Sequence, residues 1–198
     1  MKEYELVVTY KCNWKCKYCA VDTHNQDDLD LEDVFKKIEK IEDGSNVTLS
    51  GGELGMKKKK YLLPIIEALE NKNCNLALNT NGLFIRTHPD LIKRFEYILY
   101  HCSENLTTID HLPDSFDSSF TQYMIVVDDT NFKNLDSFLS RYPDIVFDIV
   151  PATLPEGIKG TTLSYKNRVM IFTRYTSRMT EESKHYLMKG RPYDIEYL

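Results

Sequence analysis

The chain has 198 residues, of which 42% are hydrophobic, and its formal net charge is −5. This length and apolar content fit one domain with a sizeable core, and the acidic balance argues against a dedicated nucleic-acid-binding protein. No apolar run approaches the roughly 20 residues of a membrane span, and the N-terminus MKEYELVVTY has acidic residues where a signal peptide is basic. We therefore expect a cytoplasmic protein with no membrane partner.

The first half of the chain alternates predicted strands with predicted helices. The strands cover residues 4–10, 46–50, 75–79 and 97–101, and the helices cover residues 30–42, 61–71 and 89–94. Asp30 is the predicted N-cap of the first helix, whose apolar residues recur on one face of a 3.6-residue period: Leu31, Val34, Phe35, Ile38 and Ile41. Pro64 is expected near the first turn of the second helix, where proline is tolerated.

The second half continues this alternation less regularly. Predicted strands cover residues 121–127, 145–150 and 168–173, predicted helices cover 131–141 and 180–189, and a polar loop covers 103–119. Alternation at this spacing predicts an α/β fold with a mostly parallel sheet. The chain is too short for a closed eight-stranded barrel, which needs about 200–250 residues or more. We expect a partial (β/α)6 TIM-like barrel in one domain, residues 1–198, with a core over about 3–151 and a C-terminal extension over about 152–198.

Three of the five cysteines lie in the segment KCNWKCKYCA, directly after the first predicted strand. Cys12, Cys16 and Cys19 have the spacing C-x3-C-x2-C. Their clustering and the odd total do not fit a disulfide framework, and in the cytosol such a cluster is more typical of a metal site. Three thiolates suit a soft metal site and leave one coordination position free. Tyr18 brings an aromatic ring to the rim of this site.

Other candidate site residues follow the remaining predicted strands, at the edge where ligands gather in parallel α/β sheets. They are Gly51, Gly52 and Glu53 after the second strand, Asn79, Thr80, Asn81 and Gly82 after the third, Ser103 after the fourth, and Val150 and Pro151 at the end of the sixth. The two glycines allow close backbone approach. We therefore expect all these residues to share one rim with the cysteine loop.

The loop C-x3-C-x-(aromatic)-C and the SGGEL turn together resemble radical S-adenosylmethionine (SAM) enzymes. In that family the three cysteines carry a [4Fe–4S] cluster whose fourth iron is chelated by SAM. The sequence departs from the usual Gly-Gly-Glu-Pro because Leu54 replaces the proline. The resemblance implies that Cys12, Cys16 and Cys19 bind the cluster. It also implies SAM contacts from Tyr18, Gly51, Gly52, Glu53, Asn79, Asn81, Ser103 and Val150.

The resemblance further implies reductive cleavage of SAM and hydrogen abstraction from a substrate by the resulting radical. Between Lys159 and Arg191 there are eight Lys or Arg residues against two Glu, and Lys57–Lys60 form a second basic cluster. These charges favour a small acidic or nucleotide-like substrate that carries phosphate or carboxylate. An electron donor such as flavodoxin or ferredoxin is the implied protein partner. No catalytic acid, base or hydrogen donor is assigned, although Tyr123 and Cys102 lie near the expected rim.

Three alternatives remain open from the sequence. Two are radical chemistries on other substrates, namely a base in nucleic acid and the backbone of a partner polypeptide in a glycyl-radical activating enzyme. The third is a non-catalytic Cys3His zinc module with His24 as the fourth ligand. A zinc loop gives no reason for a Gly-Gly-Glu turn at the next strand end. Cys74 and Cys102 are interpreted as buried small apolar residues.

Overall fold

The architecture is a parallel sheet whose strands alternate with helices. The computed structural model describes residues 2–16, 19, 27–102, 106, 108–114, 116–127, 134–145, 147–151, 163–165, 168–170 and 195–197. One seven-stranded sheet has the order β6-β5-β4-β3-β2-β1-β9, with every pairing parallel. Its strands are β1 (Glu3–Thr9), β2 (Asn46–Gly51), β3 (Asn75–Thr80), β4 (Tyr97–His101), β5 (Thr121–Val127), β6 (Phe147–Pro151) and β9 (Ile195–Tyr197). Among the described strands no pairing joins β6 to β9, so the sheet is not closed, and the predicted partial TIM-like barrel is confirmed.

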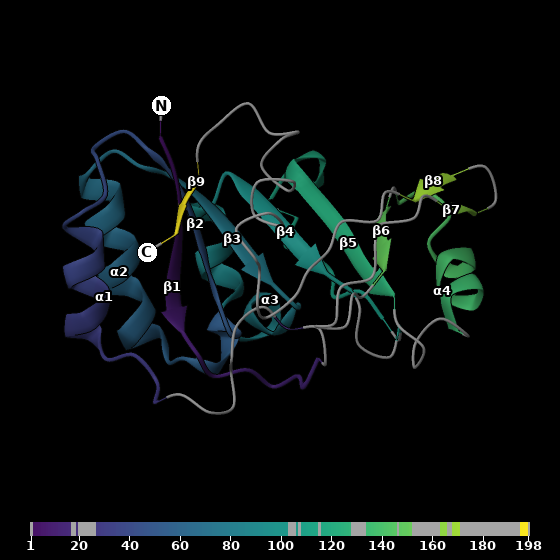
Figure 1. Ribbon diagram of the computed structural model, residues 1–198, viewed down its shortest axis with the longest axis horizontal. Coiled ribbons are helices and arrows are strands. Elements are labelled where there is room, and N and C mark those ends of the chain that lie inside the picture. The colour runs from purple at the N-terminus through teal and green to yellow at the C-terminus, as the bar shows by residue number, and fades with distance from the viewer. Residues whose placement is uncertain are drawn as a thin grey trace.

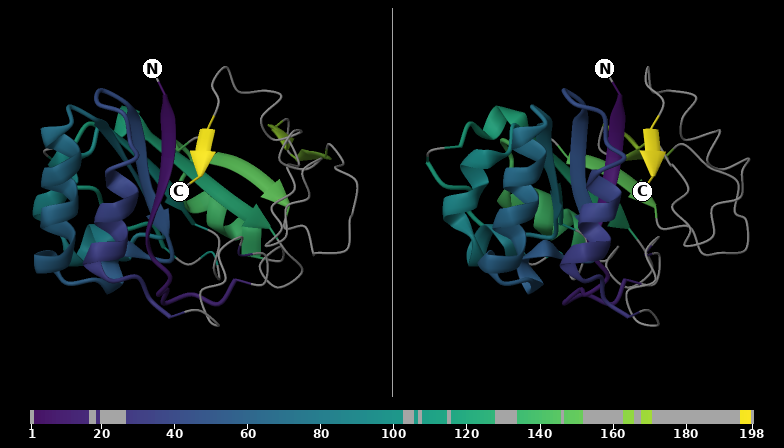
Figure 2. Two further views of the ribbon diagram at one scale, coloured as in Figure 1. Left: turned by 60° about the vertical axis from the view of Figure 1, so that its left-hand side comes forward. Right: turned by 90° about the vertical axis from the view of Figure 1, so that its left-hand side faces the viewer.

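Helices and short turns connect these strands. The helices are α1 (Leu31–Ile38), α2 (Lys59–Asn71), α3 (Leu83–Thr87) and α4 (Leu135–Arg141), and the 3-10 turns are η1 (Leu54–Met56), η2 (Pro89–Arg94) and η3 (Ser118–Phe120). The short strands β7 (Leu163–Tyr165) and β8 (Arg168–Met170) form an antiparallel pair. Figure 1 shows α1 and α2 side by side, next to β1 and β2, and Figure 2 shows them from two further directions. Within the described residues, no helix has the length and apolarity needed to cross a bilayer.

The first helix begins as predicted but ends early. The Asp30 side chain accepts a hydrogen bond from the Asp33 N–H at 2.9 Å, so it is the N-cap. The helix ends at Ile38 instead of residue 42 because the Ile41 N–H bonds to the carbonyl three residues back, in 3-10 fashion. Ile41 nevertheless stays in the core, as its position on the apolar stripe predicts.

Other boundaries also differ from the prediction. Helix α2 begins at Lys59 instead of residue 61, so Pro64 lies in its second turn and not near its first. Helix α3 and the strands β7 and β9 were not predicted. The predicted helix over residues 180–189 lies outside the described residues.

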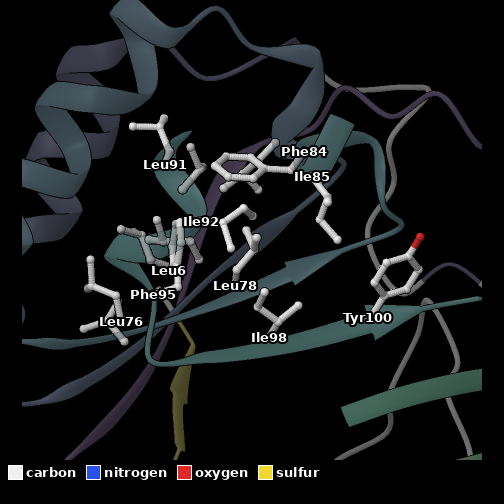
Figure 3. Packing of buried hydrophobic residues seen from close by; sticks show 14 of the residues in the cluster. Leu6, Leu76, Leu78, Phe84, Ile85, Leu91, Ile92, Phe95, Ile98 and Tyr100 are labelled. Carbon is white, nitrogen blue, oxygen red and sulfur yellow. The ribbon is translucent and has the colours of Figure 1, made fainter. Parts of the chain in front are cut away.

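The core lies between the sheet and its helices. Strands β1 to β4 bury alternate residues, and Figure 3 shows Leu6, Leu78 and Ile98 packed with Phe84 and Ile92. The opposite face of the sheet is mostly polar along β1 to β3, whereas Leu99, Met124 and Val126 form a small apolar cluster on β4 and β5. On the polar part, Ser50 Oγ donates to Glu5 Oε1 at 2.6 Å, and Asn75 Nδ2 donates to Asn46 Oδ1 at 3.0 Å. Parallel sheets that are buried on both faces are usually apolar on both, so the polar residues along β1 to β3 depart from that pattern.

Candidate active site

The cysteine loop leaves the carboxyl end of β1. Cys12, Cys16 and Cys19 are half-buried and form no disulfide. The Trp14 N–H lies 3.4 Å from Cys12 Sγ, and the Cys19 N–H donates to the Cys16 carbonyl at 3.2 Å. Burial raises the pKa of the Cys12 thiol to about 11. The Trp14 N–H works to lower this pKa, whereas the charges of Glu53, Cys16 and Cys19 raise it further. All three cysteines therefore follow the carboxyl end of β1, at one edge of the sheet.

The chemistry of these donors fits a thiolate-bound cluster. Among the described side chains, no three His, Cys, Asp or Glu residues converge closely enough to enclose a single metal ion. The loop does, however, offer three thiols after one strand end, none of them in a disulfide, and three thiols are the donor set that iron–sulfur clusters require. Tyr18, the predicted ring at the rim, and His24, the alternative zinc ligand, lie outside the described residues.

The Gly-Gly-Glu turn packs directly against the start of the cysteine loop. The Gly52 N–H donates to the Thr9 carbonyl and the Glu53 N–H donates to the Lys11 carbonyl, both at 2.7 Å. A Cβ atom at Gly52 would lie 2.1 Å from the Lys11 carbonyl oxygen, and one at Gly51 would lie 2.3 Å from the Thr9 carbonyl oxygen. The glycines are therefore required for the contact between turn and loop.

The Glu53 carboxylate points into the protein and joins the turn after β2 to the turn after β3. Oε1 accepts from the N–H groups of Gly55 at 2.9 Å and Phe84 at 3.0 Å, and Oε2 accepts from the Asn81 N–H at 2.7 Å. Thr80 Oγ1 lies 3.0 Å from both oxygens. Only 1% of Glu53 is exposed, and this burial raises its pKa although every one of these donors works to lower it.

Asn81 brings the turn after β3 into contact with the cysteine loop. Its Nδ2 donates to Asn13 Oδ1 at 2.9 Å and lies 3.9 Å from Cys12 Sγ. Its Oδ1 accepts from the Leu83 N–H at 3.2 Å, at the start of α3. The structure thus brings together three of the segments that the sequence assigned to one rim: the cysteine loop, Gly51–Glu53 and Thr80–Gly82.

The structure describes the remaining candidate residues only in part. Asn79 is half-buried near the end of β3, and strand alternation puts it on the polar face of the sheet. The backbone of Val150 lies in β6, paired with Val126 of β5, but its side chain is outside the described part of the chain. Ser103 also lies outside the described residues.

Two further predictions concern apolar packing. Cys74 and Cys102 are 8% and 6% exposed, which confirms that both are buried. Burial raises the pKa of the Cys102 thiol. Leu54, which replaces the family's proline, is completely buried and begins η1. Leu54 therefore anchors the turn in the apolar core.

The basic cluster Lys57–Lys60 is partly used within the protein. Lys57 Nζ lies 2.8 Å from Asp28 Oδ2, and Lys59 forms an ion pair with Asp90. Neither Asp28 nor its contact with Lys57 was singled out from the sequence. The two residues are 29 positions apart, and no local pattern signals such a pairing. Thr80 was noticed only as part of a turn, although its hydroxyl bonds Glu53.

Comparison with known families agrees with this geometry. The model of the Radical SAM superfamily matches residues 6–133, which include the cysteine loop, the Gly-Gly-Glu turn and the turn after β3. The chain belongs to the radical SAM superfamily. It is therefore an enzyme of the radical SAM class. A comparison with curated proteins finds no match.

Proposed function

We propose that this radical SAM protein binds a [4Fe–4S] cluster through Cys12, Cys16 and Cys19 and uses SAM to abstract hydrogen from a small substrate. The observation that carries the proposal is the contact of the three-cysteine loop with both the Gly-Gly-Glu turn and Asn81 at one end of the sheet. A closed zinc site would not need this contact.

When bound, the cluster and SAM supply the reductive cleavage of the C5′–S bond and the 5′-deoxyadenosyl radical that abstracts hydrogen. The protein's own residues hold the reactants in line. The backbone carbonyls at Gly51 and Gly52 would accept from the ammonium at the methionine end of SAM, whereas the Gly52 N–H already donates to the Thr9 carbonyl. The carboxylate of Glu53 already accepts from several donors, so its part is to keep the turn in this shape.

The rest of the SAM site follows from its place along the sheet edge. We assign Asn79 and Asn81 to polar contacts with SAM, Ser103 to its ribose and Val150 to its adenine, with the Tyr18 ring at the cluster. Asn81 has the strongest support because it already touches the cysteine loop. Its contact with Asn13 also holds it beside Cys12.

For the substrate we propose a small acidic or nucleotide-like molecule, with flavodoxin or ferredoxin as electron donor, in the cytoplasm. Lys57 and Lys59 are engaged in ion pairs. Attraction of an anionic substrate therefore falls to Lys58, Lys60 and the basic residues between Lys159 and Arg191. The half-buried polar face of the sheet supports a polar substrate over an apolar one.

The test is anaerobic reconstitution with iron and sulfide, followed by metal analysis and an assay for 5′-deoxyadenosine with a reductant and SAM. We expect about four iron atoms per chain and deoxyadenosine formation. Cys16→Ala removes a proposed ligand and is expected to abolish both. Cys74→Ala is the matched control because Cys74 is buried away from the loop, and it retains both. One tightly held zinc and no deoxyadenosine would contradict the proposal.

A further inference from the structure

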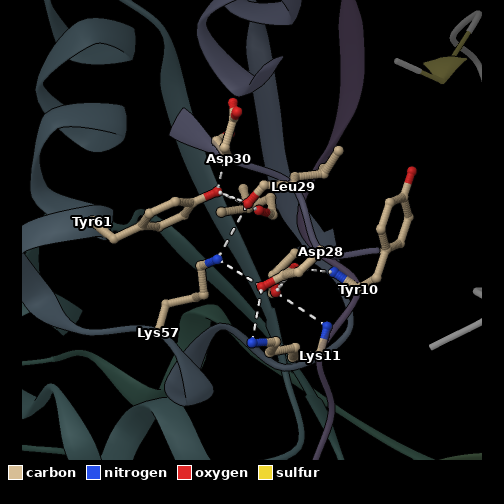
Figure 4. A network of polar contacts seen from close by, with 9 residues as sticks. Tyr10, Lys11, Asp28, Leu29, Asp30, Lys57 and Tyr61 are labelled. Carbon is tan, nitrogen blue, oxygen red and sulfur yellow. Dashed lines mark hydrogen bonds and ion pairs between the residues drawn. The ribbon is translucent and has the colours of Figure 1, made fainter. Parts of the chain in front are cut away.

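Asp28 fastens the two ends of the cysteine loop to each other. Asp28 Oδ1 accepts from Thr9 Oγ1 at 2.6 Å and from the Tyr10 N–H at 2.9 Å, where the loop begins. Asp28 Oδ2 lies 2.8 Å from Lys57 Nζ, just beyond the Gly-Gly-Glu turn. We call Thr9, Tyr10, Asp28 and Lys57 the Asp28 clasp, and Figure 4 shows its contacts.

The clasp is anchored from the helical side by Tyr61 of α2. Lys57 Nζ lies 3.7 Å from the centre of the Tyr61 ring and 3.4 Å from the Leu29 carbonyl. The Tyr61 hydroxyl lies 3.1 Å from the Val8 carbonyl of β1 and 3.0 Å from that of Leu29. Strand, loop end and helix therefore meet at one point, and Lys57 has a fixed place in it.

Both charges of the clasp are shielded from solvent. The Asp28 and Lys57 side chains are only 14% and 13% exposed. Partial burial works to raise the pKa of Asp28. The hydrogen bonds from Lys57, Thr9 and the Tyr10 N–H outweigh this effect and hold the pKa below its ordinary value. The pair is thus an ionic contact in a partly desolvated place, unlike an exposed surface pair.

The same stretch of backbone receives the clasp and the Gly-Gly-Glu turn. Asp28 binds Thr9 and Tyr10 from one side, while the Gly52 and Glu53 N–H groups bind the carbonyls of Thr9 and Lys11. Cys12 follows immediately. A change at the clasp is therefore transmitted over a few bonds to the first cysteine, without passing through the core.

We propose that Asp28 is a positioning residue that closes the cysteine loop at its base and holds its cysteines at the rim before any cluster binds. The part of this inference that concerns the cluster rests on the proposed function. Closing a loop has an entropic cost that grows with its length. Because the clasp forms when the protein folds, this cost is offset during folding and not when a cluster binds. The clasp thus adds to the contacts that the start of the loop makes with the Gly-Gly-Glu turn and with Asn81.

The five cysteines allow a test on the full-length protein without metal. Cys12, Cys16 and Cys19 report on the loop, and the buried Cys74 and Cys102 report on the core. The rate of alkylation by iodoacetamide is measured for each cysteine by mass spectrometry. Asp28→Asn is expected to raise the rates of the loop cysteines about tenfold relative to the two core rates, which change only as far as global unfolding does. Exposed Asp27 provides the matched control Asp27→Asn, with wild-type rates expected throughout.

Two further variants separate the clasp from a general loss of stability. Lys57→Met is expected to raise the same loop rates, and Lys57→Arg, which keeps the positive charge, is expected to restore most of the protection. The double variant Asp28→Asn/Lys57→Met is expected to be no worse than the stronger single variant, since both act on one contact. Purely additive effects would overturn the inference. So would unchanged loop rates, or a parallel rise at all five cysteines.

The second readout is the rate at which an iron chelator strips the reconstituted protein. Asp28→Asn is expected to lose iron about tenfold faster than wild type, and Asp27→Asn at the wild-type rate. Equal rates of iron loss in wild type and Asp28→Asn would overturn the link between clasp and cluster. A wild-type protein that takes up no iron would contradict the proposed function, and the alkylation test would still decide the role of Asp28.

Discussion

Two carboxylates hold the candidate site together in different ways. Glu53 is 1% exposed and accepts only from neutral donors, namely backbone N–H groups and the Thr80 hydroxyl. Asp28 lies nearer the surface and has the charged partner Lys57. Glu53 connects two turns that belong to the folded sheet. Asp28 attaches the cysteine loop to that folded sheet. Glu53 is therefore part of the rim itself, whereas Asp28 fastens the cysteine loop to the rim.

The surroundings of each carboxylate determine how much stability the protein would lose if that carboxylate were removed. Removing the Glu53 carboxylate leaves several buried donors without an acceptor, at a position that is only 1% exposed to solvent. Removing the charge of Asp28 leaves the Lys57 ammonium with the Leu29 carbonyl and the Tyr61 ring as partners. Perturbing Glu53 should therefore affect global stability, and perturbing Asp28 should mainly affect the loop.

The largest expected effect is that of Glu53→Ala. It should lower the free energy of unfolding by about 3–5 kcal/mol, because it orphans the N–H groups of Gly55, Asn81 and Phe84. Urea unfolding of the metal-free protein measures this change. The control Glu67→Ala, at an exposed position of α2, should cost less than about 0.5 kcal/mol. A loss below about 1 kcal/mol for Glu53→Ala would mean that its carboxylate is free for a ligand.

Gly52→Ala should have the next largest effect. Its new Cβ would meet the Lys11 carbonyl oxygen at 2.1 Å, so the turn must separate from the loop, at a cost of about 3 kcal/mol. Gly44→Ala is the contrasting control: its Cβ meets nothing within 4 Å, but its φ of +74° is strained for alanine, at about 1 kcal/mol. Equal losses in urea unfolding would show that the contact between turn and loop is not tight.

Asp28→Asn should have a smaller effect that depends on pH. Because the folded pKa of Asp28 lies below its ordinary value, its contribution is present above the ordinary pKa of about 3.9 and is lost as the pH falls through the folded value. Wild type should exceed the variant by about 1–2 kcal/mol at pH 7, and the two should converge below about pH 4. Urea unfolding of wild type and variant, at pH 7 and below about pH 4, measures this difference. If the difference in free energy of unfolding did not change with pH, the charge of Asp28 would not be the cause of the stabilisation.

The smallest effect should come from the neighbour of Lys57. Lys58 is exposed, so Lys58→Ala should leave unfolding and the alkylation rates of the loop cysteines unchanged. Lys57→Met should change both, although the two lysines are adjacent in one basic cluster. Similar behaviour of the two variants would mean that charge density, and not the clasp, holds the loop.

The sequence predicted the regular parts of this fold well. The predicted bounds of β4 and β5 agree with the structure, and so does the cap at Asp30, because alternation and capping are local signals. Helix α3 was missed because it is short and begins after Gly82 without a side-chain cap. The shift of Pro64 into the second turn of α2 follows from a start that no capping side chain marks.

The candidate site was predictable only where its residues form motifs. The cysteine spacing and the Gly-Gly-Glu turn signalled which loops meet, and the family match agrees. The direction of the Glu53 side chain depends on donors from the turn after β3 and from α3, which a motif does not encode. The Asp28 clasp depends likewise on partners distant in sequence, and it appears only once the strands are assembled.

Electron paramagnetic resonance of the reduced, reconstituted protein, with and without SAM, tests the central claim most directly. A cluster held by three cysteines has one iron free for SAM, so its spectrum should change when SAM is added. The signal should be absent in Cys16→Ala and present in Cys74→Ala. A protein that gives no such signal, or a signal that SAM leaves unaltered, would contradict the assignment of an open cluster to Cys12, Cys16 and Cys19.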